Sequence, residues 1–229
     1  ARNFNNADTA FLVLGSTITG LRTPLLDTPS ITGVGITSFT VNYLDPFNPT
    51  GTTYEAQTSN NNFGTVAASS TTALLNATLF NISTNTAYAS RVRAVNNGAV
   101  SNWLNFPSTY TLAARPVALD YLSVDIDSVT PAWLGMGNPY GTTYYAEVSS
   151  DSFNSVIGSS NTWLTNARVL FASSPNISIS ARVRGRNGLG VYTDWEVMNA
   201  TYTLAALPGF AAFSNVGTSS ITANWSANN

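Results

Sequence analysis

Apolar and polar residues alternate along most of this chain. Phe39, Val41 and Tyr43, for example, are separated by the polar residues Thr40 and Asn42. Successive side chains of a β-strand point to opposite faces, so a period of two predicts strands with one buried face. No stretch shows the 3.6-residue period of a long amphipathic helix. The pattern therefore predicts an all-β protein.

Turn-forming dipeptides separate the alternating segments, at Asn48-Pro49, Asn97-Gly98, Asn138-Pro139 and Asn187-Gly188. Short strands with frequent turns are typical of a β-sandwich or a barrel. The pattern predicts strands at 28–34, 37–44, 52–59, 72–79, 86–96 and 108–112, then at 119–125, 127–134, 142–149, 163–170, 177–187 and 200–204, with weaker ones near 64–67 and 155–158.

The chain also repeats itself. Pro24, Pro116 and Pro208 recur at intervals of 92 residues, and the second and third follow the similar runs 109–113 and 201–205. Solenoid repeats have periods of about 20–50 residues, so a repeat this long is a self-contained module. We expect whole modules at 24–115 and 116–207. Residues 1–23 are then the C-terminal strands of a preceding module, and 208–229 the first two strands, A and B, of a further one.

The linkers between these modules are short. Residues 113–116 and 205–208 each end in a proline, which fixes one backbone dihedral angle and stiffens the connection. We expect a semi-rigid rod that belongs to a longer array.

Composition excludes several classes of function. Charged residues make up 9% of the chain, against about 25% in ordinary proteins, and the net charge is −2. The chain therefore lacks the basic footprint of a nucleic-acid-binding protein. It has no cysteine for disulfides or thiolate metal sites, and no apolar run long enough to span a membrane.

Catalysis is not expected, and neither is a cofactor or a metal. Without histidine or lysine, a serine or threonine nucleophile lacks its usual base. Asp125 and Asp127 form the nearest approach to a carboxylate pair, with Asp120 close by. We interpret them as a solvated turn; a calcium site and a catalytic pair are the alternatives.

All nine cationic residues are arginines, and five of them recur in two matching segments. Arginines two residues apart on a strand share one face of a sheet. One interpretation is a solvent-facing strand whose guanidinium groups meet Glu55 or Glu147 on a neighbouring strand. The other is an interaction surface for a neighbouring chain or an anionic glycan. These arginines are Arg91, Arg93, Arg182, Arg184 and Arg186.

Three features recur at matching places in the modules. A proline opens the first strand, A, a large aromatic residue closes the second, B (Tyr43, Trp133, Trp225), and Gly-Thr-x-Tyr leads the third, C. In these features each module resembles a fibronectin type III repeat. Tyr88 matches the position where this family's tyrosine hydroxyl bonds the backbone upstream, while Ile179 replaces it in the second module. The resemblance implies tandem immunoglobulin-like β-sandwiches of a large bacterial cell-surface or secreted protein.

The aromatic residues divide into two groups. Tyr54 and Tyr144, with the strand-B aromatics, are expected to be core or cross-strand residues, whereas exposed aromatics could stack on sugar rings. The residues whose burial the pattern leaves open are Trp103, Trp163 and Trp195.

Three functions fit these features. The first is a non-catalytic extracellular structural array that forms a surface stalk, fibre or sheath and self-assembles through neighbouring modules. The second is an adhesive or carbohydrate-binding module with its site in loops such as 45–51 and 135–141. The third is a spacer within a larger secreted enzyme.

Overall fold

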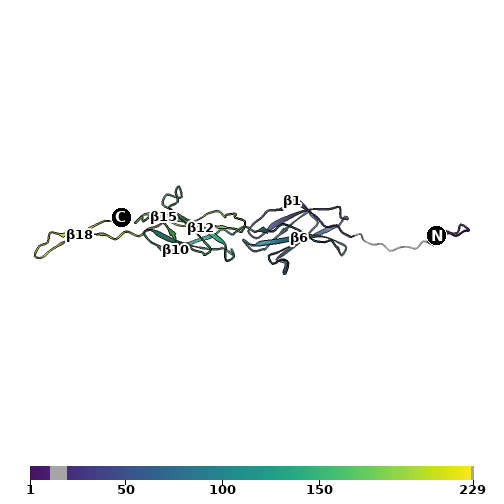
Figure 1. Cartoon of the computed structure of the whole chain (residues 1–229), viewed down its shortest axis with the longest axis horizontal. Helices are drawn as coiled ribbons and strands as arrows, with labels where there is room; N and C mark the ends of the chain where they lie inside the picture. Colours follow the sequence, from purple (N-terminus) through teal and green to yellow (C-terminus); the bar gives the residue numbers. More distant parts are fainter. Residues whose placement is uncertain (11–19, 228–229) are drawn as a thin grey trace.

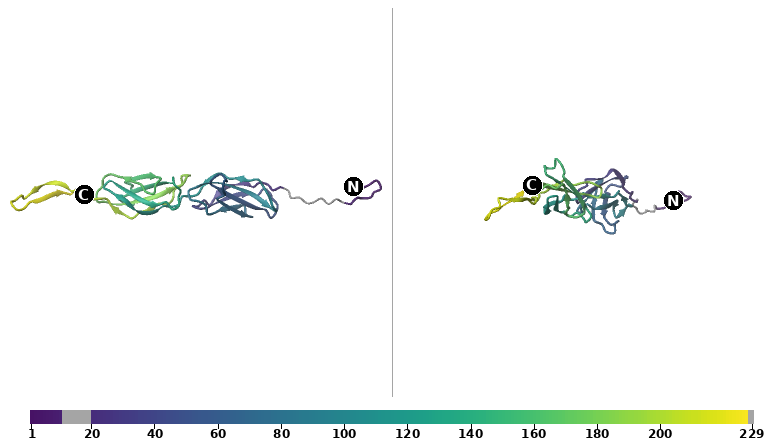
Figure 2. Two further views of the ribbon diagram at one scale, coloured as in Figure 1. Left: turned by 90° about the horizontal axis from the view of Figure 1, so that it is seen from below. Right: turned by 60° about the vertical axis from the view of Figure 1, so that its left-hand side comes forward.

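A computed structural model describes residues 1–10 and 20–227 of the chain. Two β-sandwiches lie end to end along its longest axis, and a two-stranded hairpin extends beyond the second (Figure 1, Figure 2). Every strand pair is antiparallel. Among the described residues no helix could cross a membrane.

The first sandwich places two sheets face to face. One sheet has the order β1-β2-β5, and the other has the order β4-β3-β6-β7, with β8 and β9 also paired to β6. The strands are β1 (Leu25–Thr32), β2 (Phe39–Leu44), β3 (Thr53–Ser59), β4 (Ala68–Thr72), β5 (Asn76–Leu79), β6 (Ala87–Asn96), β7 (Ala99–Val100), β8 (Leu104–Asn105) and β9 (Thr109–Tyr110).

The second sandwich repeats this plan. Its sheets have the orders β10-β11-β14 and β13-β12-β15-β16, with β17 also paired to β15. The strands are β10 (Val117–Val124), β11 (Ser128–Leu134), β12 (Thr143–Ser149), β13 (Gly158–Thr162), β14 (Val169–Leu170), β15 (Ser178–Arg186), β16 (Glu196–Val197) and β17 (Thr201–Tyr202). The tandem β-sandwich fold predicted from the repeat is thus confirmed.

Alternation along the strands builds the two cores. Phe39, Val41 and Tyr43 are fully buried, and the Tyr43 ring packs against Tyr54 with ring centroids 5.1 Å apart. The second core contains the matching pair Trp133 and Tyr144, at 5.5 Å. The prediction that these strand-B and strand-C aromatics lie in the cores is correct for all four.

Trp225 is the exception, because its side chain is 69% exposed. It lies in the hairpin β18 (Gly209–Ser214) and β19 (Thr222–Ser226), whose register pairs Phe210 with Trp225 just as β10–β11 pairs Ala118 with Trp133. Of the two positions expected for Trp225, core or cross-strand, the structure shows the cross-strand one. No described sheet faces this hairpin, so its apolar face has nothing to pack against.

The strand predicted at 72–79 is two strands. Residues 68–72 form β4 beside β3, whereas 76–79 form β5 in the opposite sheet beside β2. In the second module the strand predicted at 163–170 begins just after β13 ends, and only residues 169–170 of it form a strand, β14. Residues 64–67 and 155–157, where weak strands were expected, form irregular loops before β4 and β13, and Gly158 is the first residue of β13.

The assignment of the two chain ends to neighbouring modules stays a prediction. Residues 11–19, in the middle of the N-terminal segment, lie outside the described residues. Before them, Arg2 and Asp8 form an isolated antiparallel bridge and an exposed ion pair at 3.0 Å.

Two local features test the family resemblance. The Tyr88 hydroxyl accepts a hydrogen bond from the Ser83 amide at 2.9 Å, which confirms the expected corner. Ile179 occupies the matching position as a buried apolar residue. Pro131 was expected at an edge strand or at a bulge. Its strand, β11, is central in the sheet, which excludes the edge. The register between β10 and β11 shifts on both sides of the Tyr121–Pro131 pair, so the bulge is the correct alternative.

Candidate interaction surface

The arginines of the predicted stripe lie on the outer faces of β6 and β15. In β6 the buried residues Tyr88, Ser90 and Val92 alternate with half-buried ones, which include Arg91 and Arg93. The same alternation in β15 places Arg182 and Arg184 on the outer face of the second module, followed by the more exposed Arg186. Both strands are central in their sheets, so neighbouring strands flank the stripe on each side.

In the first module the guanidinium groups bond to strand β3. Arg93 and Glu55 are register partners, and Arg93 donates from Nε to Glu55 Oε2 at 2.8 Å, with Nη2 2.7 Å from the same oxygen. Arg91 donates from Nε and Nη2 to Gln57 Oε1 at 3.1 and 2.8 Å. Each arginine is therefore held by the residue directly across from it.

A tryptophan covers both of these arginines. The Trp103 ring lies 4.2 Å from the Arg91 guanidinium carbon and 4.5 Å from that of Arg93, and Phe63 lies 4.0 Å from Arg91. A cation over an aromatic face contributes about 0.5–2 kcal/mol, depending on how far it is desolvated. The stacked rings thus replace part of the hydration of two neighbouring positive charges.

The second module builds the same stack with Trp195. Its ring lies 4.2 Å from Arg182 and 4.3 Å from Arg184. Arg182 also donates from Nε to Glu147 Oε2 at 2.8 Å. Trp103 and Trp195 are therefore both half-buried and both stack on two arginines. The expected contact of an arginine with Glu55 or Glu147 is made by Arg93 and Arg182, respectively.

The two modules differ in which arginine has an acidic partner. The glutamate lies two residues further along β12 than along β3, so Arg184 faces Tyr145 instead of a carboxylate. Arg184 stacks on Tyr192 at 3.9 Å, and its buried Nε has no hydrogen-bond partner among the described residues. Arg186 is exposed and lies 5.5 Å from the Tyr192 ring. As an interaction surface, the stripe of five arginines remains a prediction.

Asp125 and Asp127, the nearest approach to a carboxylate pair, lie between β10 and β11. Asp125 lies in the turn between β10 and β11, where its amide bonds the Ser128 carbonyl at 2.8 Å and its carboxylate accepts from the Ser128 hydroxyl at 3.4 Å. Among residues 1–10 and 20–227, no three acidic, histidine or cysteine side chains gather where they could hold a metal ion.

A second surface was missed by sequence reasoning: the joint between the modules. Asn138, in the Asn-Pro turn of the second module, holds the linker residue Ala114 by two hydrogen bonds. Its Oδ1 accepts from the Ala114 amide at 2.8 Å, and its Nδ2 donates to the Ala114 carbonyl at 2.8 Å. Ala114 is 7% exposed, so water has little access to this pair of bonds.

The end of the first module also contacts the second directly. Asn85 donates to the Thr142 hydroxyl at 2.8 Å and accepts from the Gly188 amide at 3.0 Å. Asn187 donates to the Thr111 carbonyl at 3.3 Å. A Cβ atom added to Gly188 would lie 2.3 Å from the Tyr110 ring, so the two modules approach closely here.

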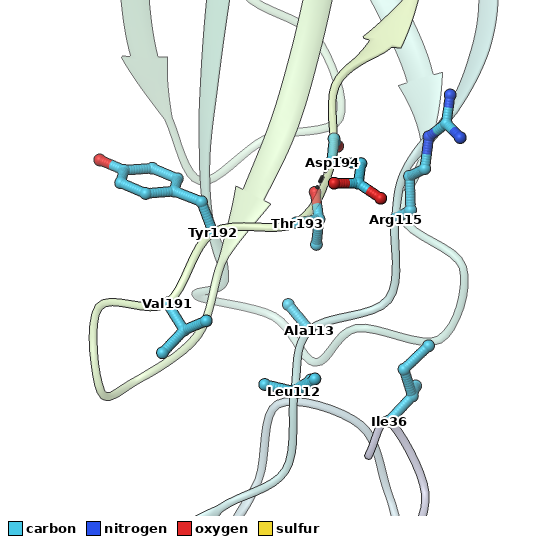
Figure 3. Close-up of a pocket in the computed structure, with 8 residues that line it drawn as sticks. All are labelled: Ile36, Leu112, Ala113, Arg115, Val191, Tyr192, Thr193 and Asp194. Carbon is cyan, nitrogen blue, oxygen red and sulfur yellow. Dashed lines mark hydrogen bonds between the residues drawn. The ribbon is translucent and has the colours of Figure 1, made fainter. Parts of the chain in front are cut away.

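Beside these contacts an open hollow of about 310 Å³ remains at the joint (Figure 3). Ile36 and Leu112 line it from the first module, and residues 191–194 line it from the second. Ala113 and Arg115 of the linker complete the wall.

The bond pattern around Asn138 recurs one module earlier. Asn48 accepts from the Arg22 amide at 2.8 Å and donates to the Arg22 carbonyl at 3.1 Å. Arg22 and Ala114 each lie two residues before the proline that opens their module. The repeated Asn-Pro turn therefore fixes the incoming linker of both modules, and this shared Asn was the signal in the sequence.

Comparisons with known proteins identify the architecture and no closer relationship. No family model matches the chain, and no curated protein is similar to it. A two-domain fibronectin type III segment of chicken tenascin aligns over 79% of this chain and 99% of its own length, with a TM-score of 0.55 and 12% identity. The FN1–FN3 domains of chicken CNTN1 align over 91% of this chain and 76% of their own length, with a TM-score of 0.37 and 12% identity.

The fold is a tandem of fibronectin type III-like β-sandwiches. At 12% identity the tenascin segment shows the fold alone, and a fold of this kind supports many functions.

Proposed function

We propose that this chain is part of a non-catalytic extracellular array that holds its modules in an extended line, as a stalk, fibre or sheath at a cell surface. The observation that carries the proposal is the joint between the two modules. A flexible string of domains needs no contacts across its linkers, whereas this joint has several.

The joint restricts movement in two ways. The linker residues Ala113 and Ala114 are buried, and Pro116 limits the backbone just after them. The contacts of Asn85, Asn138 and Asn187 then fix how the two modules are oriented. Interfaces within a chain allow domain motion by default unless such specific contacts oppose it.

Composition supports side-by-side assembly of such rods. Because only 9% of the residues are charged, few charged groups are desolvated when two modules pack together. The hairpin β18–β19 adds Phe210, Phe213 and Trp225, all more than half exposed, as apolar surface that another sandwich could cover.

Small-angle X-ray scattering tests the extended shape. We expect a rod-like profile for the whole chain that fits one arrangement of the two sandwiches. A profile that requires an ensemble of bent and straight forms would refute the proposal.

Assembly is tested separately, by sedimentation over a wide concentration range and by electron microscopy. Association or filaments are expected. If the chain remains monomeric at high concentration and forms no filaments, the assembly part of the proposal is refuted. The extended shape of the single chain would not be affected by that result.

A further inference from the structure

The second module has an exposed aromatic hollow that plays no part in its core. Its volume is about 450 Å³, and it lies at the ends of β12 and β13. The lining residues are Tyr140, Thr143, Asn161, Thr162, Trp163 and Leu164. None of them is charged, so this is a neutral surface.

Three large side chains of this hollow face water. Trp163 is 67% exposed, Tyr140 is 93% exposed and Leu164 is 57% exposed. Trp163 begins a turn in which the Leu164 amide donates to the Thr162 hydroxyl at 3.0 Å. The backbone that presents the indole ring is therefore fixed before any ligand arrives.

The first module shows that the fold does not need these aromatics. It forms the same turn, with the Leu74 amide bonded to the Thr72 hydroxyl at 3.0 Å. The register is also the same, since Tyr54 pairs with Thr72 and Tyr144 with Thr162. Yet Ala73 stands where the second module has Trp163. Thr50 likewise stands in place of Tyr140 within the matching Asn-Pro-x-Gly turn.

Polar groups border the aromatic surface. The Asn161 side chain is exposed and bonds to no other described residue, and Thr143 lines the same hollow. Tyr140 and Thr143 also line an adjoining hollow that reaches the joint and includes Asn85 and Arg186. The concave surface is therefore larger than the area that one six-membered sugar ring would cover.

We propose that this surface binds an oligosaccharide, with one pyranose ring stacked on Trp163 and Tyr140. The axial C–H groups of a pyranose form an apolar face with partial positive charge, which suits the electron-rich face of an indole. Its equatorial hydroxyls need neutral donors and acceptors, which Asn161 and Thr143 supply at the rim. Further sugar units would follow the adjoining hollow toward Arg186.

This inference does not depend on the extended array. A flexible chain could bind a glycan at this surface, and a rigid one could lack the site. The two proposals therefore succeed or fail separately.

The test applies the whole chain to an array of purified neutral and acidic oligosaccharides. The glycans that bind are then titrated by NMR, with the indole N–H signals of the five tryptophans as probes. We expect the Trp163 signal to shift. Trp163→Ala, which copies Ala73, is expected to weaken binding at least tenfold, and Tyr140→Thr, which copies Thr50, to weaken it less.

Trp225→Ala is the matched control, because Trp225 is 69% exposed but lies in the β18–β19 hairpin. It should leave affinity unchanged. If acidic glycans bind best, Arg186→Gln should reduce that preference; if neutral ones do, it should have no effect. In either case the Trp163 dependence remains the deciding result.

Binding to none of the glycans would overturn the proposal, as would binding that survives in folded Trp163→Ala. A third result would also overturn it: no glycan binding, but self-association that Trp163→Ala abolishes. The hollow would then be a contact between copies of this chain.

Discussion

Replacing Asn138 by alanine tests whether the linker contact orders the joint. The substitution removes both hydrogen bonds to Ala114. It also removes two weaker contacts of Asn138, with the Thr84 and Tyr144 hydroxyls, both at 3.3 Å. Ala114 is 7% exposed, so its amide and carbonyl groups lose their partners in a nearly dry environment. Each unpaired buried group costs roughly 1–3 kcal/mol.

Water that enters the loosened joint recovers part of this cost. We therefore expect the docked arrangement to lose about 2 kcal/mol relative to undocked ones. Since 1.4 kcal/mol corresponds to a factor of ten, the population of undocked forms rises roughly 30-fold. Asn138 belongs to neither hydrophobic core, so the modules should undock without unfolding.

Electron–electron distance measurements can detect this change. The chain has no cysteine, so spin labels can be placed at Ser69→Cys and Ser159→Cys alone. These residues are exposed, in β4 and β13, one in each module. The parent chain should give a narrow distribution of distances, and Asn138→Ala a clearly broader one.

Asn48→Ala is the internal control, because Asn48 makes the same two bonds to Arg22 at the other end of the first module. It should leave the distance distribution unchanged. Equal widths for the parent chain and Asn138→Ala would refute the reasoning. Equal broadening by the control would show that the effect is not local to the joint.

Three further substitutions test the modules individually. Tyr88→Phe removes the hydroxyl of the corner, so the first module should lose about 1 kcal/mol in urea unfolding while the second is unchanged. Gly158→Ala places a Cβ atom 2.3 Å from the Leu170 carbonyl oxygen, so the second module should lose about 1–3 kcal/mol; an unchanged urea midpoint would contradict this close contact. Hydrogen bonds, above all from the Ser155 hydroxyl, lower the pKa of Asp151 from 3.8 to about 2. Because the folded-state pKa is depressed, the carboxylate stabilises the second module above pH 4, and this contribution is lost as the pH falls from about 4 to 2. NMR titration of the Asp151 carboxyl should show the low midpoint, and Asp151→Asn should remove this part of the acid sensitivity.

The repeat and the period-two pattern together determined the fold class and most of the core. Phe39, Val41 and Tyr43 alternate with polar residues, and a strand that alternates has one face to bury whichever sheet it joins. The resemblance to fibronectin type III repeats also implied the role of Tyr88, whose corner joins residues close together in the chain.

The sheet to which each strand belongs was decided only by tertiary structure. Residues 72–79 were predicted as one strand, and they contain no proline or glycine that would mark the crossing from β4 to β5. A pattern of side chains carries no information on which partner strand accepts the backbone hydrogen bonds. The same limit explains Trp225, since its sequence context matches Trp133 and only the absence of a described facing sheet leaves it exposed.

The sites show the same division. Sequence placed the arginines on one face of their strands, but register decided that Arg93 meets Glu55 while Arg184 meets Tyr145. The contacts of Asn138 with the linker and the exposure of Trp163 also required the folded chain. Sequence by itself determined which residues share a face and where a module repeats, because these follow from local backbone geometry. The partners across sheets and between modules join residues far apart in the chain, so only the tertiary structure decided them.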